Sequence, residues 1–462
     1  MPERLKFDLG FGRPGGTRHD DGDPMRLLVL GDFRGRGERP ATPERQREGG
    51  PATPERERKG GPAPLADRPT QQVDVDSLDE VIERMGPRLA LSAGEIQFRQ
   101  IDDFHPDRLY QRLERFQALR DKRAKPPAED DDLLGRLLGK APQQKAAAPA
   151  PAGGLDALIH KVVAPHIVKD TSAQTRMFVA ALDAAIADEM RAVLHDPAFQ
   201  ALEAAWRGVH WLVSNLELDE NLQLHLLDVS REELLADVVS ASGQLPQTGL
   251  YRTLVDRWRN VPGSHGWSAF VGLFQFGPSN TDVGLLAALG LIASNAGGQV
   301  LAGGDAELAG NDEARLAGWT ALRRSEAAPW IALGAPRILL RMPYGKRSDP
   351  IESFAFEEFD GPPVHEELLW GQASLALALL LGRGFTERGW EMEPGDQREI
   401  GDLPAYTFTR DGEQVMQACA ERFMSESEME SLLEAGLVPI VSRRDRNAVV
   451  AVRFQSIAIA DR

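Results

Sequence analysis

The chain has 462 residues, a formal net charge of −17 and a hydrophobic content of 42%. This length exceeds what one ordinary core supports, so two or more units are expected, and no apolar run reaches the roughly 18 residues that a membrane-spanning helix needs. The acidic balance disfavours nucleic-acid binding, because contacts with phosphates require a surplus of lysine and arginine.

The single cysteine and the N-terminal sequence bear on the cell compartment. Cys419 has no partner in the chain for a disulfide and excludes a zinc site with several cysteines, so we expect a small packed side chain. Residues 1–16 mix charged and single apolar residues and lack the continuous apolar core of a secretory signal. Together these features predict a cytoplasmic protein without membrane insertion.

A first unit is predicted over residues 1–123. The apolar run MRLLVLGDF, residues 25–33, predicts a strand buried on both faces. A duplicated proline-rich and charged segment follows, so residues 37–70 are expected to form a disordered loop. A helix capped by Ser77, a short strand over 96–101, and one amphipathic helix that opens at Pro106 and carries apolar positions up to Leu119 complete the unit.

Residues 124–154 are rich in proline and alanine, and this composition predicts a linker. Within it, the amphipathic patch 133–138 is interpreted as a transient helix, with a docking helix as the alternative. A second unit is expected over residues 155–462.

The second unit alternates helices and strands. Helical sequence runs over 155–216, and Asp196 with Pro197 predicts a new helix start inside it. The further elements expected are strands over 222–228, 267–276, 338–342, 437–441 and 448–459, and helices over 281–296 and 370–381. Strands interleaved with helices predict a mixed α/β fold, with mixed sheets flanked by helices.

Motifs for catalysis or cofactor binding are not found in the sequence. There is no GxxxxGK[ST] loop, residues 345–348 lack the required preceding glycine, and the glycines of residues 31–37 miss the GxGxxG register. No HExxH or GxSxG motif occurs, and His365 with its two following glutamates predicts a solvated turn. We therefore predict no catalytic, cofactor-binding or metal-binding residue and no cofactor.

Two sets of sequence stretches point to a known family more specifically than any of the catalytic motifs considered above. The strand LLVLGDF, the segment VDVDSLDEVIERMGPRL and the segment IQFRQIDDFHPDRLYQRLERFQALRDKR resemble the small sheath subunit of type VI secretion, TssB or VipA. The LGDF-like strand end and the DF.P..L element of that family fall on the following residues: Asp32, Phe33, Asp103, Phe104, Pro106 and Leu109.

Residues 155–462 resemble the large sheath subunit, TssC or VipB. The matching stretches, in order, are HDPAFQALEAAWRGVHWLV, PRILLRMPYG, FEEF, LLWGQASLALALLL and GDLPAYTF. The candidate motif or interface residues in them are Trp206, Pro343, Tyr344, Gly345, Trp370 and Gly371. We expect residues 343–345 to shape a turn after a core strand. For the tryptophans, burial in the core is favoured over a role at an interface.

The resemblance implies a structural part of a contractile sheath that surrounds an inner tube and contracts to propel it, and no enzyme. The implied partners are other sheath protomers, the inner tube protein and baseplate proteins. An AAA+ ATPase disassembles sheaths of this family, but the linker replaces the segment that it is expected to recognise. The final segment usual in the large subunit is also not matched. A non-polymerising adaptor or cap at the sheath or baseplate is therefore an alternative, and an enzyme with an unrecognised site among the carboxylates is a third.

Overall fold

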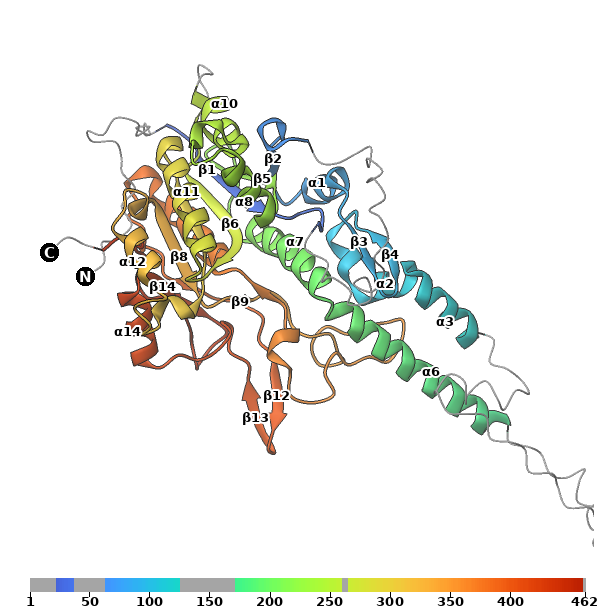
Figure 1. Cartoon of the computed structure of the whole chain (residues 1–462). Coiled ribbons are helices and arrows are strands. Elements are labelled where there is room, and N and C mark those ends of the chain that lie inside the picture. Colours follow the sequence, from blue (N-terminus) through green and yellow to red (C-terminus); the bar gives the residue numbers. More distant parts are fainter. Residues whose placement is uncertain (1–21, 37–62, 125–170, 260–264, 460–462) are drawn as a thin grey trace, which may run out of the picture.

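A computed structural model describes residues 22–36, 63–124, 171–259 and 265–459 (Figure 1). Its main element is a nine-stranded sheet with the order β11-β15-β14-β8-β7-β6-β1-β5-β2. The strands are β1 Met25–Gly31, β2 Gln71–Val73, β5 Leu222–Asp228, β6 Ala269–Phe276, β7 Gln299–Gly304, β8 Ile331–Ala335, β11 Glu399–Ile400, β14 Leu437–Ser442 and β15 Val449–Ala451. The central strands from β5 to β14 are parallel, while β2, β15 and β11 are antiparallel additions at the edges. The predicted mixed α/β fold is confirmed.

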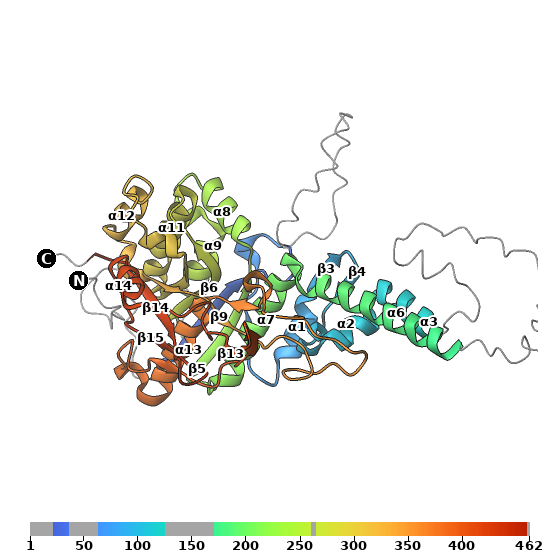
Figure 2. The same cartoon turned by 90° about the horizontal axis from the view of Figure 1, so that it is seen from below.

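Helices cover both faces of this sheet (Figure 2). Leu27 and Val29 of β1 belong to the apolar core on one face, whereas Leu28 and Leu30 belong to the core on the other. This double burial explains why the central strands are continuous apolar runs. The first face carries α7 Pro197–Asn215 and α13 Ala373–Arg388, and the second carries α8 Arg231–Ser240, α11 Asn280–Ala296, α12 Ala317–Arg323 and α14 Glu426–Glu434.

The first unit forms a small group of elements beside α7. These are α1 Leu78–Met85, β3 Arg88–Leu91, β4 Gly94–Gln97, α2 Pro106–Arg112 and α3 Glu114–Ala124. The long helix α6 Thr171–Leu194 lies beside α3 in both views (Figures 1 and 2). Ion pairs join these two helices, from Arg115 to Glu189 at 3.0 Å and from Arg123 to Asp183 at 2.8 Å.

Short elements complete the described part of the chain. The hairpin of β12 and β13 projects from the body (Figure 1). The short strands are β9 Ile338–Leu339, β10 Trp370–Gly371, β12 Thr407–Arg410 and β13 Glu413–Met416. The short helices are α9 Gly249–Tyr251 and α10 Arg257–Arg259, which flank the π-helical turn η6 Arg252–Asp256, together with the 3-10 turns η2 Leu65–Asp67, η3 Ile101–Phe104, η5 Leu245–Gln247, η7 Ala306–Ala309, η8 Ala328–Trp330, η9 His365–Glu367 and η10 Gly389–Glu391.

Several predicted elements are confirmed. The strand over 222–228 is β5, the strand over 25–33 is β1, and the helix over 281–296 is α11. The new helix start at Asp196 is also present, because its carboxylate accepts from the amides of Ala198 and Phe199 at 2.9 and 3.1 Å. Cys419 is 0% exposed, as expected for a small packed side chain.

The single helix predicted from Pro106 is wrong. It is divided into α2 and α3 at Leu113, whose backbone is extended with φ −75° and ψ 133°. Leu113 is 0% exposed, so core packing of this side chain accompanies a break that no proline or glycine marks. Ser77 occupies the predicted cap position of α1, but its hydroxyl binds Asp74 at 2.7 Å rather than an amide of the helix.

Other boundaries also differ from the predictions. The strand over 96–101 ends earlier, at Gln97, and Ile101 begins a 3-10 turn. The helix expected from residue 370 starts at Ala373, because Trp370 and Gly371 pair with β9 instead. The strand over 338–342 has only two residues, and that over 448–459 ends at residue 451.

The predicted loop and linker lie mostly outside the described residues. Residues 37–62 and 125–170 are not described, and they include the patch 133–138 and the predicted helical start at 155. The end of the predicted loop is ordered, however. Residues 65–67 form η2, and Leu65 and Arg68 are each 8% exposed. Thr253 fixes this turn by donating to the Leu65 carbonyl at 2.7 Å.

Candidate functional site: the contact between the two regions

Two regions of the chain share the nine-stranded sheet. The N-terminal region comprises residues 22–36 and 63–124, and the C-terminal region comprises residues 171–259 and 265–459. β1 of the N-terminal region pairs in parallel with β5 on one side and with β6 on the other. All seven residues of β1 are buried. One region thus supplies a middle strand to the sheet of the other, and we take their contact as the candidate functional site.

Aromatic side chains form the apolar part of this contact. The rings of Phe33 and Trp206 lie 5.0 Å apart, and the Trp206 indole Nε1 donates to the Phe33 carbonyl at 3.0 Å. Phe98 stacks on Phe104 at 4.2 Å, and both rings lie against Phe199. Helix α7 supplies Phe199 and Trp206 about two turns apart on one face, so a single helix receives both the end of β1 and the segment before α2.

A set of charged side chains lies at the carboxyl ends of β1 and β5. Arg36 binds Asp228 at 2.8 Å and Glu233 at 3.1 Å, and Arg68 binds Glu233 at 2.6 Å. Arg36 also binds Asp32 at 3.2 Å, within the N-terminal region. We call the following residues the strand-end network: Asp32, Arg34, Arg36, Arg68, Asp228 and Glu233.

Local sequence places these groups. Gly35 has a φ of +73°, a left-handed conformation that lets the chain turn after β1 and aim Arg34 and Arg36 back at the sheet. Glu233 is held in a capping box with Ser230 at the start of α8, directly after β5. Arg36 and Glu233 are therefore brought together by two local turns, and no motif that spans the two regions marks their pairing in the sequence.

Burial and ion pairing act in opposite directions on the carboxylates of the strand-end network. Burial raises the pKa of Asp228 above its usual range, against the charge of Arg36. Burial also disfavours ionised Glu233, but the hydrogen bond from Arg68, the Ser230 amide and the charge of Arg36 outweigh it and lower the pKa of Glu233.

The strand-end network lies at an edge of the sheet where many α/β proteins bind a ligand. The chain passes from β1 to β5 in one direction and from β5 back across β1 to β6, so the strand order reverses between β1 and β6, directly beside this network. In open α/β sheets, the crevice outside the carboxyl ends at such a reversal is where ligands bind. Arginine side chains of the protein itself, Arg34 and Arg36, occupy this edge and pair with Asp228. The arrangement joins two regions rather than presenting open donors to a ligand.

A second set of charged side chains is buried between α7 and residues 341–358. Arg341 binds Glu203 at 3.0 Å and Glu358 at 2.8 Å. Arg207 binds Glu203 at 2.6 Å and donates to the Tyr344 hydroxyl at 2.8 Å. We call these five residues the buried network. Its two arginines balance its two glutamates, as charges removed from water require.

Electrostatics of the buried network keep Glu358 ionised. Glu203 is 0% and Glu358 is 2% exposed. Burial disfavours the charge on Glu358, but Arg341, His195 and the Tyr344 amide outweigh it and lower the pKa of Glu358 to about 2. Burial raises the pKa of the Tyr344 phenol to about 12, so its hydroxyl stays protonated at neutral pH.

The N-terminal region contacts the chain segment that carries this network. The His105 ring meets the Tyr344 ring edge to face at 5.1 Å. The Asp107 carboxylate accepts from the amides of Glu352 and Ser353 at 3.1 and 2.9 Å. Burial opposes ionised Asp107, but these hydrogen bonds outweigh it and lower the pKa of Asp107. Motif segments of the two regions, quoted separately above, therefore meet in space.

The structure brings together seven of the residues singled out in the sequence, and their neighbours complete the contact. These seven are Asp32, Phe33, Asp103, Phe104, Pro106, Trp206 and Tyr344. Asp103 acts locally, since it binds Arg112 at 2.6 Å and the Arg99 amide at 2.7 Å. Pro106 opens α2 as its first residue.

The remaining predicted residues do not lie at this contact. Gly345 donates from its amide to the Asp349 carbonyl at 2.9 Å, and the Pro343 carbonyl accepts from the Ser348 hydroxyl, so both lie in a turn. Trp370 and Gly371 form β10, where the Trp370 indole donates to the His365 carbonyl at 2.8 Å.

Sequence reasoning missed the charged residues of both networks, above all Glu203, Arg341 and Glu358. One signal was present. Glu203 lies four residues after Phe199, on the face of α7 that carries the apolar stripe, where a charged residue is out of pattern. Arg341 and Glu358 offered no comparable signal, because charged residues in irregular segments usually face water.

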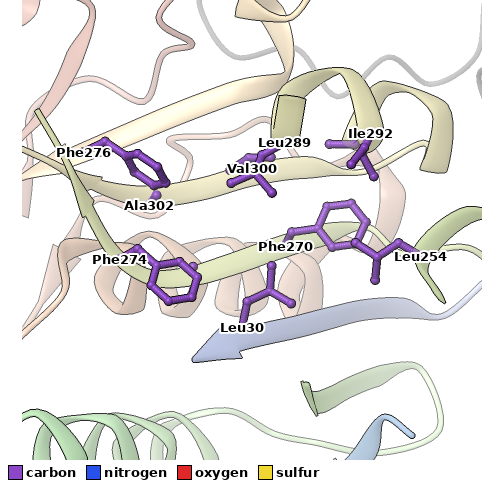
Figure 3. A pocket seen from close by; sticks show the side chains of 11 residues that line it. Leu30, Leu254, Phe270, Phe274, Phe276, Leu289, Ile292, Val300 and Ala302 are labelled. Carbon is purple, nitrogen blue, oxygen red and sulfur yellow. The ribbon is translucent and has the colours of Figure 1, made fainter. Parts of the chain in front are cut away.

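Two cavities lie beside the residues described so far. The smaller, about 10 Å³, is lined by apolar side chains between β6, β7 and α11 and is a packing gap in the core (Figure 3). The larger, about 260 Å³, lies at the carboxyl ends of β6, β7 and β8 and includes Arg337, His365 and Glu421. Burial opposes ionised Glu421, but Arg337 outweighs it and lowers the pKa of Glu421, so this carboxylate is paired rather than poised as an acid.

Metal-binding clusters and membrane-spanning helices are both absent from the described residues. No group of three or more histidine, cysteine, aspartate or glutamate side chains there is arranged to hold a metal ion. Within the same residues, no helix has the length and apolar character required to cross a membrane.

Comparison with known proteins completes the description. Residues 176–458, more than half of the chain, match the family model of the EvpB/VC_A0108 (VipB) tail sheath N-terminal domain. The chain is also 31% identical over 314 residues to the type VI secretion system sheath protein TssC1 of Pseudomonas aeruginosa. That similarity covers 63% of this chain and 63% of the relative, so the chain spans less than two thirds of the length of the curated protein it matches.

Proposed function

We propose that this chain, which belongs to the EvpB/VC_A0108 (VipB) family of tail sheath proteins, is a structural component of a type VI secretion contractile sheath. The observation that carries the proposal is the family match over residues 176–458, which spans the C-terminal region from α6 to the residues after β15. The role is mechanical and not catalytic: the chain assembles with other copies around an inner tube and contracts to propel it.

The N-terminal region, in this proposal, takes the place of the small sheath subunit within the same polypeptide. Three features support it: the LGDF-like end of β1, the IDDFHP segment before α2, and the contact of both with the C-terminal region. Whether the small subunit is separate or fused, it has to supply β1 to the sheet between β5 and β6.

The contact suits a protein that bears load. β1 is bonded along its length to β5 and over part of its length to β6, so pulling it out breaks several hydrogen bonds at once. The aromatic cluster, the strand-end network and the hydrogen bonds of Asp107 fix the same region at its side. The partners proposed are other sheath protomers, the inner tube protein and baseplate proteins, in the cytoplasm. An AAA+ ATPase is a further partner only if it recognises a segment other than the one expected near the start of the large subunit.

Electron microscopy tests the sheath proposal. The full chain is imaged by negative stain alone and after mixing with the purified inner tube protein of a type VI system, and the tube protein alone is the control. We expect tubes or stacked rings wider than those of the tube protein, in which this chain is present. Uniform single particles in every condition would overturn the sheath role and favour the adaptor or cap.

Cleavage of the chain tests the small-subunit role. A specific protease site is inserted within residues 125–170, and the cut protein is analysed by size-exclusion chromatography. We expect the two fragments to stay together, because β1 is buried between β5 and β6. Val29→Asp, in the buried strand, is expected to release the N-terminal fragment, whereas Val75→Asp, at a side chain 61% exposed, is the matched control that keeps it. Separation of the unsubstituted fragments would contradict the proposal.

A further inference from the structure

The sequence of β1 leaves its register weakly specified. Six of its seven residues are apolar or glycine, and only Arg26 carries a charge. A parallel strand buried on both faces keeps its apolar character on both faces when it slips by two residues, since side chains alternate with a period of two. Some other feature has to fix β1 between β5 and β6.

Arg26 lies against two tryptophans of the C-terminal region. Its guanidinium carbon is 4.3 Å from the ring centroid of Trp258 and 4.2 Å from that of Trp267. The two indoles meet edge to face at 5.3 Å, so they form adjacent walls of one corner. The guanidinium also donates from Nη1 to the His265 carbonyl at 2.5 Å. A planar cation between indole walls and a carbonyl is a site suited to arginine.

The backbone of Arg26 is held at the same place. Its amide donates to the Ser268 hydroxyl at 3.0 Å, and the Ser268 amide donates to its carbonyl at 2.9 Å. Ser268 and Trp267 directly precede β6, so side chain and backbone of one residue are fixed by one short segment. A slip by two residues would move the guanidinium about 6.6 Å along the sheet and away from this corner.

Burial makes such a displacement unfavourable. Arg26 is 6% exposed, and burial lowers its pKa to about 10, so the side chain is still a cation at neutral pH. In the direction of the strand's C-terminus, the slipped cation would enter the apolar position of Leu28, which is 0% exposed. A buried cation without its partners is strongly disfavoured.

We infer that Trp258 and Trp267 form an arginine-recognition corner that sets the register of β1 and selects, as the partner of this sheet, an apolar strand with arginine at its second position. This inference rests on the proposed small-subunit role, because only then does strand selection determine which region pairs with which. The partner chemistry is specific: an extended apolar segment that carries one guanidinium, from the same copy or from a second copy of this chain.

Cysteine crosslinking reads the register directly in the full chain. In a Cys419→Ala background, the pair Leu30→Cys with Leu227→Cys reports the observed register, in which these residues are opposite each other. The pair Leu28→Cys with Leu227→Cys reports a slip by two residues. With Arg26 present, we expect the first crosslink alone. Arg26→Met is expected to raise the slipped crosslink about tenfold, as loss of a desolvated cation–π contact allows, and Arg26→Lys to raise it less.

A double-mutant cycle provides the second measurement. Arg26→Met, Trp258→Leu and the double variant are unfolded with denaturant, and Trp211→Leu replaces Trp258→Leu in the control cycle, since both indoles are half-buried and Trp211 lies in the other core. Coupling of about tenfold in the folding equilibrium is expected for Trp258 and none for Trp211.

The outcomes separate this inference from the function on which it rests. Unchanged crosslinking in Arg26→Met, or equal coupling in the two cycles, would overturn the arginine-recognition corner even if the chain forms sheaths. Coupling to Trp258 together with a slipped crosslink would support it even if electron microscopy shows single particles, and the sheath role alone would then fail.

Discussion

The strand-end network joins the two regions by ion pairs, whereas the ion pairs of the buried network lie within the C-terminal region, and an arginine of each network differs in access to water. Arg36 of the first is 23% exposed in its side chain, whereas Arg341 of the second is 8% exposed. Water can replace a lost partner of Arg36 more readily than one of Arg341, whose glutamate partners are 0% and 2% exposed. The comparison teaches that the number of ion pairs says little about their role, because the cost of an unpaired charge is set by its surroundings.

The comparison is tested most severely by Arg341→Met. This change leaves Glu358 in the interior without its arginine partner and removes one of the two arginines that bind Glu203, and we expect a loss of about 3–5 kcal/mol in the free energy of unfolding. Denaturant titration measures it. The double variant Arg341→Met with Glu358→Gln should recover part of the loss, and an equal loss in both would refute the electrostatic cause.

Acidification is expected to act on the buried network with a somewhat smaller effect. The folded pKa of Glu358, about 2, lies below its ordinary value of 4.5, so its contribution is complete above pH 4.5 and is lost as the pH falls toward 2. We expect a loss of about 3 kcal/mol over this window, which thermal unfolding at each pH would measure, and Glu358→Gln should reduce it.

Asp228 of the strand-end network sharpens this result, because its pKa is raised instead. The folded protein then binds the proton more tightly than the unfolded chain, so this group contributes stability at low pH and loses it as the pH rises through its folded pKa. Asp228→Asn should therefore not diminish the acid-induced loss. If it does so as strongly as Glu358→Gln, the assigned contrast between the networks is wrong.

A neutral hydrogen bond between the regions should rank third. Trp206→Phe removes the donor to the Phe33 carbonyl and part of a buried side chain, and we expect a loss of about 2 kcal/mol. Trp319→Phe is the matched control, because its indole is 2% exposed and its nitrogen has no hydrogen-bond partner among the described residues. The difference between the two variants in denaturant unfolding isolates the hydrogen bond, and no difference would exclude its contribution.

Arg36→Met should have the smallest effect. The substitution matches Arg341→Met in chemistry, but the Glu233 side chain is 28% exposed and Asp228 keeps Arg34 as a partner, so we expect a loss of no more than about 1 kcal/mol. Raising the salt concentration should shrink this loss further and leave that of Arg341→Met nearly unchanged. Equal losses in the two variants would break the comparison.

Local chemistry made part of the fold predictable from sequence. Asp196 with Pro197 marked a helix start, and the apolar run of residues 25–33 marked a strand buried on both faces, because both signals act within a few residues. The break at Leu113 and the pairing of Trp370 with β9 depend on distant contacts, so no local signal announced them. That residues 1–123 form a small sheath subunit stays a prediction.

The candidate site was predictable only where it is apolar. Phe33, Phe104 and Trp206 stood out through motifs and spacing, and they do contact the opposite region or its neighbours. The charged residues Arg36, Arg341 and Glu358 did not, because a single sequence does not distinguish a buried charge from a solvated one. Their burial arises from the meeting of segments that lie far apart in the chain.

The placement of β1 also means that this strand is synthesised long before the strands with which it pairs. Arg26 bonds to Ser268, 242 positions later in the chain, so β1 leaves the ribosome long before β6 exists. At translation rates of about 5–20 residues per second, this interval is roughly ten to fifty seconds. For most of that time, until β5 is made, the most apolar strand of the N-terminal region has neither neighbour, and the nascent chain is exposed to aggregation until β6 closes the centre of its sheet.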